Sequence, residues 1–226
     1  MYELDAGKFP IIKSGKNDAH AKPLSNNFAK NIIDMIGCSL ILFILAPLML
    51  AIAFFVKSDG GPALFRHKRI GANGKAFYCL KFRTMHINSS ALLEELLKHD
   101  TEAREEWERN FKLRNDPRIT KIGAFLRKSS LDELPQLINV LRGEMSLVGP
   151  RPIVEAEVPR YRESFEHYKQ CRPGLTGLWQ VSGRSDVDYD RRVKMDRMYV
   201  ESWSLLEDVK ILLKTPLAVV RSSGAY

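Results

Sequence analysis

Cysteine is scarce in this 226-residue chain, and its three cysteines, Cys38, Cys79 and Cys171, are an odd number standing far apart. No pair has the spacing of a metal-binding motif, so neither a disulfide framework nor a structural zinc site is indicated. Internal repeats and low-complexity tracts are also missing, which excludes solenoids and disordered linkers. These absences fit a folded protein in a reducing, cytosolic environment.

Charge is missing between Met35 and Val56, a run of 22 residues. As an α-helix this run would be about 33 Å long, enough to span a bilayer, so a single transmembrane anchor is one reading. A signal peptide fits less well, because a long polar lead precedes the run and apolar residues continue to its end. Pro47 disfavours a straight helix, because proline removes a helical hydrogen bond and bends the axis.

Basic residues flank both ends of this apolar run. They are Lys8, Lys13, Lys16, Lys22 and Lys30 before it and Lys57, Arg66, Lys68 and Arg69 after it. The positive-inside rule places such flanks in the cytosol, so both ends favour the same side of the membrane. We therefore predict a polar tail over residues 1–30, a re-entrant membrane helix broken at Pro47 over 31–57, and a cytosolic domain over 58–226.

Acidic residues are outnumbered, with 27 Asp and Glu against 35 Lys and Arg, which gives a net charge of +8. This excess predicts attraction to phosphates, but by itself it does not distinguish nucleic acids, nucleotides and anionic lipids. No nucleic-acid-binding motif is visible, so we expect no nucleic-acid partner. Oligomerisation is left open by the sequence.

The domain after the apolar run is expected to be α+β, with one small hairpin and mainly helices. Asn73-Gly74 predicts the turn of the hairpin. In its second strand Lys81 and Arg83 share a face with Cys79, and a solvated basic edge strand is the plain interpretation. Helices are expected over residues 89–112, around 119–128 as a basic amphipathic helix that could lie on lipid, and from 134 to about 143.

Two adjacent carboxylates, Asp132 and Glu133, precede Pro135 in "SSLDELPQLINVLRGEMSLVGPRP". Capping is the simple explanation, with Ser129, Ser130 or Asp132 beginning the helix. A functional explanation uses the same place, because helix N-termini favour anions and receive phosphate oxygens. Two arginines, Arg127 before the pair and Arg151 between two prolines, suit phosphate binding, and Mg²⁺ could bind through the carboxylates and substrate phosphates.

Several motifs in order resemble the bacterial monotopic phosphoglycosyl transferases, also called bacterial sugar transferases. They are "LAPLML", "KFRTM", "DPRITKIGAFLRKSSLDELPQLINVLRGEMSLVGPRP" and "RPGLTGLWQVSGR", and the match runs from about residue 25 to the end. At Ala46-Pro47 the chain departs from the Ser-Pro common in this family. The proline is retained, but any dependence on a serine hydroxyl is in doubt.

The resemblance implies an enzyme on the cytosolic face of the bacterial inner membrane. It would transfer a sugar-1-phosphate from a UDP-sugar to undecaprenyl phosphate, release UMP, and so begin exopolysaccharide synthesis. By the same resemblance Asp132 would be the nucleophile, with Glu133 assisting through Mg²⁺ or proton handling, and the substrate contacts would come from Lys81, Arg83, Arg127 and Arg151. Galactose-1-phosphate is the favoured group and glucose-1-phosphate the alternative.

Two rival functions remain open from the sequence. A metal-dependent glycosyltransferase of the Asp-x-Asp type would use Asp186, Asp188 and Asp190 and release UDP, although the pattern is short and not specific. A membrane-tethered adaptor would use the +8 charge to bind lipid or nucleic acid, with the carboxylates serving only as caps. Product analysis separates the first rival from a phosphoglycosyl transferase, and turnover excludes the second.

Overall fold

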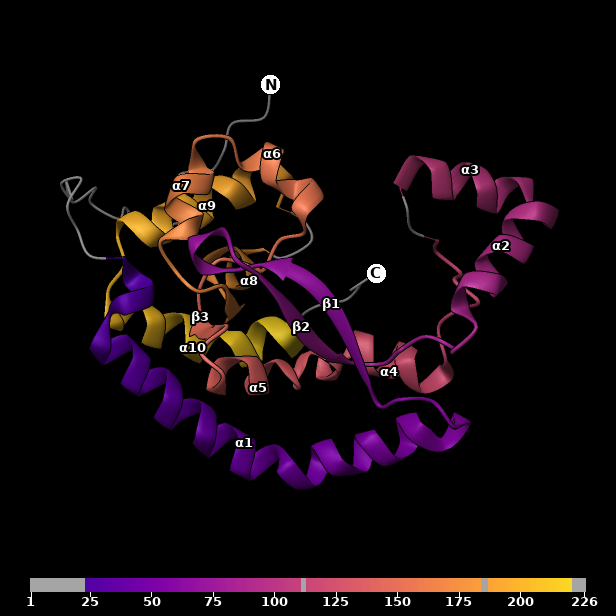
Figure 1. The fold of residues 1–226 in the computed structure, drawn as a ribbon, viewed down its shortest axis with the longest axis horizontal. Coiled ribbons are helices and arrows are strands. Elements are labelled where there is room, and N and C mark those ends of the chain that lie inside the picture. The colour runs from indigo at the N-terminus through magenta and orange to yellow at the C-terminus, as the bar shows by residue number, and fades with distance from the viewer. Residues whose placement is uncertain (1–22, 111–112, 184–186, 221–226) are drawn as a thin grey trace.

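The computed structural model describes residues 23–110, 113–183 and 187–220. Its first long element is α1 (Phe28–Val56), and a short 3₁₀ turn, η1 (Leu24–Asn26), precedes it. Most of the polar tail predicted over 1–30 lies outside the described residues. The helix α1 continues through Pro47, and Figure 1 shows it bowed along the bottom of the molecule instead of interrupted. The predicted break at Pro47 therefore does not interrupt the helical backbone.

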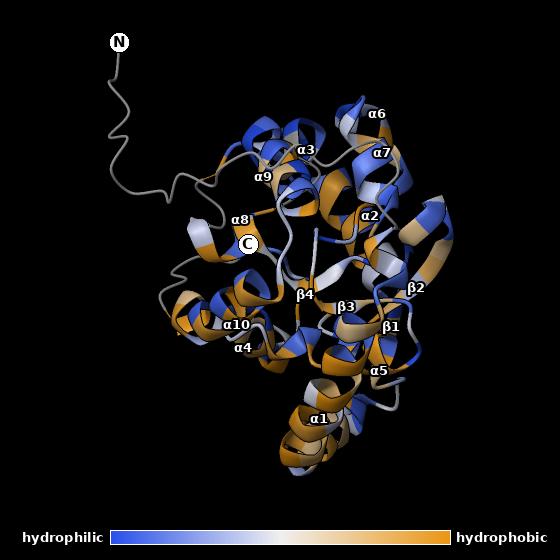
Figure 2. Cartoon of the chain, turned by 90° about the vertical axis from the view of Figure 1, so that its left-hand side faces the viewer, coloured by the Kyte–Doolittle hydropathy of each residue, from blue (hydrophilic) through white to orange (hydrophobic). Residues whose placement is uncertain are grey.

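The two ends of α1 both pack against the rest of the protein. Near its start, Cys38 is buried in the main core, and near its end Ile52 and Val56 are buried against Phe82 of the hairpin and Leu126. Between these contacts one side of the helix packs on the core through Ile41 and Leu42, while the other side is exposed, and Figure 2 shows α1 as mainly hydrophobic. In length and composition α1 is a helix that could cross a membrane.

The predicted hairpin is confirmed. It consists of β1 (Leu64–Ile70) and β2 (Ala76–Phe82), which pair antiparallel with Arg69 opposite Phe77. The turn between them, η3 (Ala72–Gly74), holds Asn73 at φ 57° and Gly74 at φ 72°, the left-handed conformation that these two residue types tolerate. The turn chemistry of Asn-Gly was therefore a sound guide to the fold.

Helices make up most of the remaining chain, as expected. Their bounds, including short 3₁₀ turns, are η2 (Lys57–Asp59), α2 (Ser89–His99), α3 (Thr101–Asn110), α4 (Lys121–Lys128), η4 (Leu131–Glu133), α5 (Gln136–Leu141), η5 (Glu155–Glu157), α6 (Val158–Tyr161), α7 (Ser164–Lys169), α8 (Leu178–Ser182), α9 (Tyr189–Glu201) and α10 (Leu205–Val220). Figure 1 shows α2 and α3 projecting to one side, while α5 lies between α1 and the hairpin.

A second, parallel pair of strands was not predicted from the sequence. It joins β3 (Ser146–Val148) to β4 (Gly174–Thr176), with Ser146 opposite Gly174. These strands have only three residues each, too short for a visible alternation of apolar and polar side chains. The pair runs through the main core, which draws on α1, β2, α5, β3, α9 and α10.

Candidate functional site

The two carboxylates occupy a tight turn between α4 and α5. Ser130 has a positive φ of 57° and reverses the chain after α4, and Asp132 and Glu133 then fall in the 3₁₀ turn η4. Helix α5 begins later, at Gln136, and neither Ser130 nor Pro135 caps a following helix through its side chain. The capping interpretation is therefore wrong for this pair, because the turn ends before the helix starts.

The strand β2 places a cation directly against the pair. Lys81 Nζ lies 2.6 Å from Glu133 Oε1 and 3.7 Å from Asp132 Oδ2. The interpretation of this strand face as a solvated edge is wrong, because Cys79 is buried and Lys81 is only partly exposed. The face that carries the lysine looks toward η4 instead of toward solvent.

Electrostatic effects on Asp132 oppose one another. Its side chain is largely buried, and burial raises the pKa of the Asp132 carboxyl above its ordinary value, as does the neighbouring charge of Glu133. The positive charges of Lys81 and Arg127 act in the other direction and favour the ionised form. The carboxylate is thus poorly solvated and lies 3.7 Å from Lys81, a setting that keeps an anion reactive.

Arg127 comes from the last turn of α4. Its Nε donates to Thr84 Oγ1 at 2.9 Å, which fixes the guanidinium beside the turn. Within the described part of the chain its terminal Nη groups have no hydrogen-bond partner. They are therefore free to donate to a phosphate.

A small pocket opens next to Glu133 and Lys81. Its lining residues are Arg69, Cys79, Lys81, Glu133, Gln136, Arg151, Pro152, Gly174, Leu175 and Gln180. Asp132 does not line the pocket itself, but its carboxylate lies 3.7 Å from Lys81, which does. Burial raises the pKa of Cys79 to about 11, so its thiol stays protonated near pH 7 and is a poor nucleophile.

Arg151 reaches this pocket because of the parallel strand pair. Gly174 N donates to Pro150 O at 2.8 Å, and the two segments come so close that a Cβ on Gly174 would lie 2.1 Å from Gly149 N. The guanidinium of Arg151 lies 5.9 Å from the ring centre of Trp179 and forms no hydrogen bond or ion pair with the described residues. Of the predicted substrate-binding arginines, this one faces the pocket.

Three further lining residues were not selected from the sequence as site residues. Arg69, which was noted only as a flanking basic residue, donates to Pro152 O at 3.1 Å. Gln136 is next to Pro135 in the carboxylate motif, and Gln180 is in "RPGLTGLWQVSGR", so their motifs were the available signal. Neutral amides carry no charge pattern, which is why residue type alone did not indicate them.

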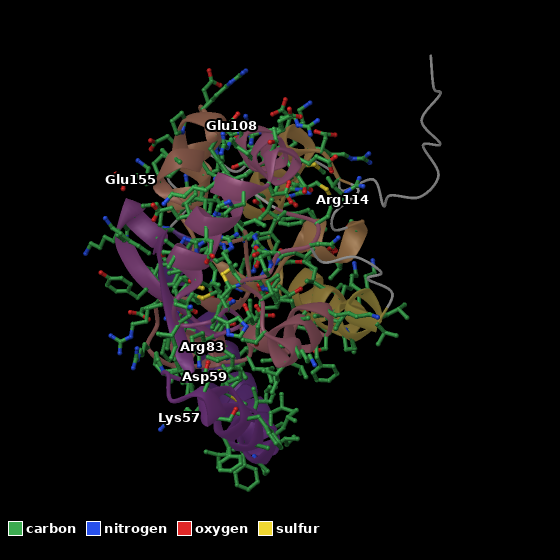
Figure 3. The ribbon with its side chains drawn as sticks, turned by 90° about the vertical axis from the view of Figure 1, so that its right-hand side faces the viewer. Lys57, Asp59, Arg83, Glu108, Arg114 and Glu155 are labelled. Carbon is green, nitrogen blue, oxygen red and sulfur yellow. The ribbon has the colours of Figure 1, made fainter. Side chains whose placement is uncertain are left out.

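Arg83 is not brought into the pocket. Nε donates to Pro62 O at 2.8 Å, Nη1 to Asp59 Oδ2 and Met85 O at 2.7 and 2.9 Å, and Nη2 to Asp59 Oδ1 and Val56 O. Figure 3 shows Arg83 beside Asp59 at the end of the molecule where α1 lies. All five N–H donors of the guanidinium are occupied, so its geometry favours a structural role over the predicted phosphate contact.

The Asp-x-Asp pattern does not form a comparable site. Asp188 is the N-cap of α9 and accepts from Arg191 N at 2.9 Å, while Asp190 lies in the first turn of the same helix. Neither lines the pocket. Asp186 lies outside the described residues.

Comparison with known proteins places this geometry in context. The family model described as bacterial sugar transferase matches residues 25–222. The chain belongs to this family. The resemblance noted from the motifs is thereby confirmed, and it counts against the adaptor alternative.

Three relatives of this bacterial sugar transferase illustrate its similarity. It is 55% identical over 89% of its length to an undecaprenyl-phosphate galactose phosphotransferase of Salmonella typhimurium, of which it covers 42%. It is 52% identical over 88% of its length to the exopolysaccharide production protein ExoY of Rhizobium meliloti, also covering 88% of that protein. With a UDP-glucose:undecaprenyl-phosphate glucose-1-phosphate transferase of Caulobacter vibrioides it shares 40% identity over 87% of its length and 72% of that protein's.

Proposed function

We propose that this protein transfers a sugar-1-phosphate from a UDP-sugar to undecaprenyl phosphate and releases UMP. The observation that carries the proposal is the Asp132 carboxylate, held in a tight turn beside Lys81 and Arg127 at the edge of a pocket walled by further cations. Such an arrangement suits attack on a phosphorus whose oxygens are held by positive charge. The family and its named relatives support the same reaction.

In the first step an oxygen of Asp132 attacks the phosphorus that carries the sugar. The bond between this phosphorus and the oxygen that bridges to the uridine-bearing phosphate breaks, and UMP leaves with the bonding electrons. An acyl phosphate then links Asp132 to the sugar. Arg151 and Arg127 have donors that no described residue occupies and that can reach the phosphate oxygens, while Lys81 faces the developing charge from β2.

In the second step the phosphate oxygen of undecaprenyl phosphate attacks the same phosphorus. The bond to the Asp132 carboxylate breaks, the carboxylate is restored, and the sugar is left on a lipid diphosphate. Covalent catalysis of this type splits one difficult displacement into two and gives ping-pong kinetics. The two negatively charged substrates then need not meet directly.

Mg²⁺ remains part of the proposal. It prefers hard oxygen ligands and is commonly held by one or two carboxylates together with substrate phosphates. Asp132 and Glu133 supply such carboxylates, whereas the described residues contain no cluster of three or more metal-binding side chains. The donor set therefore fits a metal shared with the substrate, which would neutralise diphosphate charge when bound.

The membrane placement proposed here is re-entrant on the cytosolic face. Helix α1 has 29 residues, or about 43 Å at ~1.5 Å per residue, so a helix of this length that crossed a bilayer would separate its ends. Instead Lys30 at one end and Val56 at the other are buried against the same domain. The outward side of its middle is exposed and apolar, with Phe43 81% exposed, and lipid is the medium that suits such a surface.

Labelling tests this topology. Cysteines at Asn26 and Lys57, which flank α1, are placed in a background lacking the native cysteines, and intact cells are treated with an impermeant reagent. We expect no labelling at either site until the cells are opened. Labelling of one site in intact cells would establish that α1 crosses the membrane.

Turnover without acceptor tests the chemistry. With a UDP-sugar and Mg²⁺ but no lipid, the protein should release about one UMP per active site and gain the mass of a sugar-phosphate. UDP-galactose is the first donor to try and UDP-glucose the second, because relatives are named for each sugar. Release of UDP instead of UMP would contradict the proposal and favour a glycosyltransferase.

A further inference from the structure

Two glutamine side chains in the pocket wall have unsatisfied polar groups. Gln136 is only 3% exposed, lines the pocket, and has no side-chain hydrogen bond to any described residue. Gln180 also lines the pocket, and among the described residues its Oε1 is buried without a partner. Buried amides are normally hydrogen-bonded, because leaving one unpaired costs about 1–3 kcal/mol. Gln180 Oε1 is such an exception, and Gln136 adds a second amide without a side-chain hydrogen bond to the described residues on the same wall, so the two together point to a ligand.

Both side chains are held in place by the fold. Gln136 is the first residue of α5, three residues after Glu133, and is packed at the base of the turn that holds the carboxylates. Gln180 lies in α8 and its Oε1 would be 2.6 Å from a Cβ placed on Gly177, so the glycine makes room for it.

The pocket wall contains two kinds of polar group, cations that suit phosphate and amides that suit hydroxyl groups. The oxygens of a diphosphate only accept hydrogen bonds, and Arg69, Lys81 and Arg151 supply donors and positive charge. A side-chain amide both donates and accepts, which matches a hydroxyl group that does the same. The two amides are therefore suited to sugar hydroxyls more than to phosphate.

We propose that Gln136 and Gln180 bind hydroxyl groups of the transferred sugar and set the donor preference. This inference rests on the proposed function, because it takes the pocket beside Glu133 to hold the reacting phosphorus. The sugar is bonded directly to the oxygen of that phosphorus, whereas the uracil is separated from it by ribose and a second phosphate. Groups next to the carboxylates therefore meet the sugar first.

The test pairs two variants with donors that lack single hydroxyls. Gln136→Met and Gln180→Met keep an unbranched side chain of similar length and remove the amide. The third glutamine of the chain, Gln170, is exposed at the end of α7, so Gln170→Met is the matched control. For each protein, kcat/KM for UMP release is measured with UDP-galactose, UDP-glucose and the set of UDP-deoxyhexoses, and thermal unfolding checks the fold.

We expect the wild type to lose about tenfold in kcat/KM when the hydroxyl that an amide binds is missing. The variant lacking that amide should lose about tenfold with the complete sugar and nothing further with the matching deoxy donor. If the amide binds the hydroxyl that differs between galactose and glucose, the ratio of the variant's kcat/KM values for UDP-galactose and UDP-glucose should also move toward one. Gln170→Met should follow the wild type throughout.

Retention of wild-type discrimination at every hydroxyl by both variants would overturn the inference, even if their overall rates fell. A loss that instead followed replacement of the uracil would assign the amides to the base and also overturn it. If the wild type releases no UMP from any donor, the proposed function fails separately. Dissociation constants for the same donors and variants, measured by calorimetry, then decide the inference without turnover.

Discussion

Two positively charged residues of one short stretch, Lys81 and Arg83, have opposite surroundings. Lys81 faces the carboxylate turn and lines the pocket, with its ammonium 2.6 Å from Glu133 and 3.7 Å from Asp132. Arg83 is two residues further along and on the same predicted face, yet every donor of its guanidinium is bonded to Asp59 or to backbone carbonyls.

This difference in surroundings decides whether a cation is available to bind a substrate. Carbonyls of Val56 and Pro62 mark the place where α1 ends and the hairpin begins, and Arg83 satisfies them. Lys81 Nζ is paired with carboxylates, which a phosphate-bound metal or a proton can also satisfy. Arg83, whose five donors are all bonded to backbone carbonyls and Asp59, has none left for a substrate, whereas Lys81 is paired only with the two site carboxylates.

The largest effect on the pocket side should come from Asp132→Asn. The amide lacks the anionic oxygen needed to form the acyl phosphate, so we expect UMP release to fall by about 10³-fold or more and the covalent adduct to disappear. Thermal unfolding should change little, because the Asp132 side chain caps no helix. Normal turnover by this variant would remove Asp132 as the nucleophile.

Arg151→Lys should produce the next largest effect. Charge is kept, but a lysine cannot donate two parallel hydrogen bonds to one phosphate, so kcat/KM should fall on the order of 10²-fold. Steady-state kinetics with varied UDP-sugar measure the loss. Kinetics like those of the wild type would show that Arg151 serves only to stack on Trp179.

Arg83→Met tests the other half of the comparison between Lys81 and Arg83, the structural role of Arg83. It leaves the buried carbonyl of Val56 and the partly buried carbonyl of Pro62 without this donor, so the free energy of unfolding should fall by about 2 kcal/mol or more. At a temperature where the variant is still folded, its kcat/KM should stay within a few-fold of the wild type. A stable variant with a 10²-fold activity loss would instead restore the predicted phosphate contact.

The smallest expected change is a shift in pH dependence, which should accompany the loss of rate on changing Lys81 to Met. Burial raises the pKa of Asp132, so the proposed nucleophile should lose its charge as the pH falls, and the acid limb of activity is expected above the ordinary value of 3.8. Lys81 lowers this pKa, and its removal should therefore move the acid limb to higher pH. Rates of UMP release across pH measure the shift, and an unchanged or lowered limb would contradict the assignment.

Much of the candidate site was visible in local sequence. The Asn73-Gly74 turn fixed the hairpin, and the order of motifs identified the family and drew attention to Asp132 and Glu133. What residue type did not reveal was that the neutral side chains Gln136 and Gln180 line the pocket, and that Gln180 Oε1 is buried there without a partner among the described residues. Burial is a property of packing and has no local signature in the chain.

The sequence by itself determined that a long apolar helix precedes a basic domain, and that two carboxylates are adjacent, because hydrophobicity, charge and chain neighbourhood are properties of residues in order. Only the tertiary structure decided which cations reach those carboxylates. Lys81 is 51 residues away from Asp132 along the chain and meets it because β2 passes beside the turn η4, and Arg151 reaches the pocket through the pairing of β3 with β4. Pairing of this kind joins distant segments through backbone hydrogen bonds and side-chain packing, so it is fixed when the whole core forms.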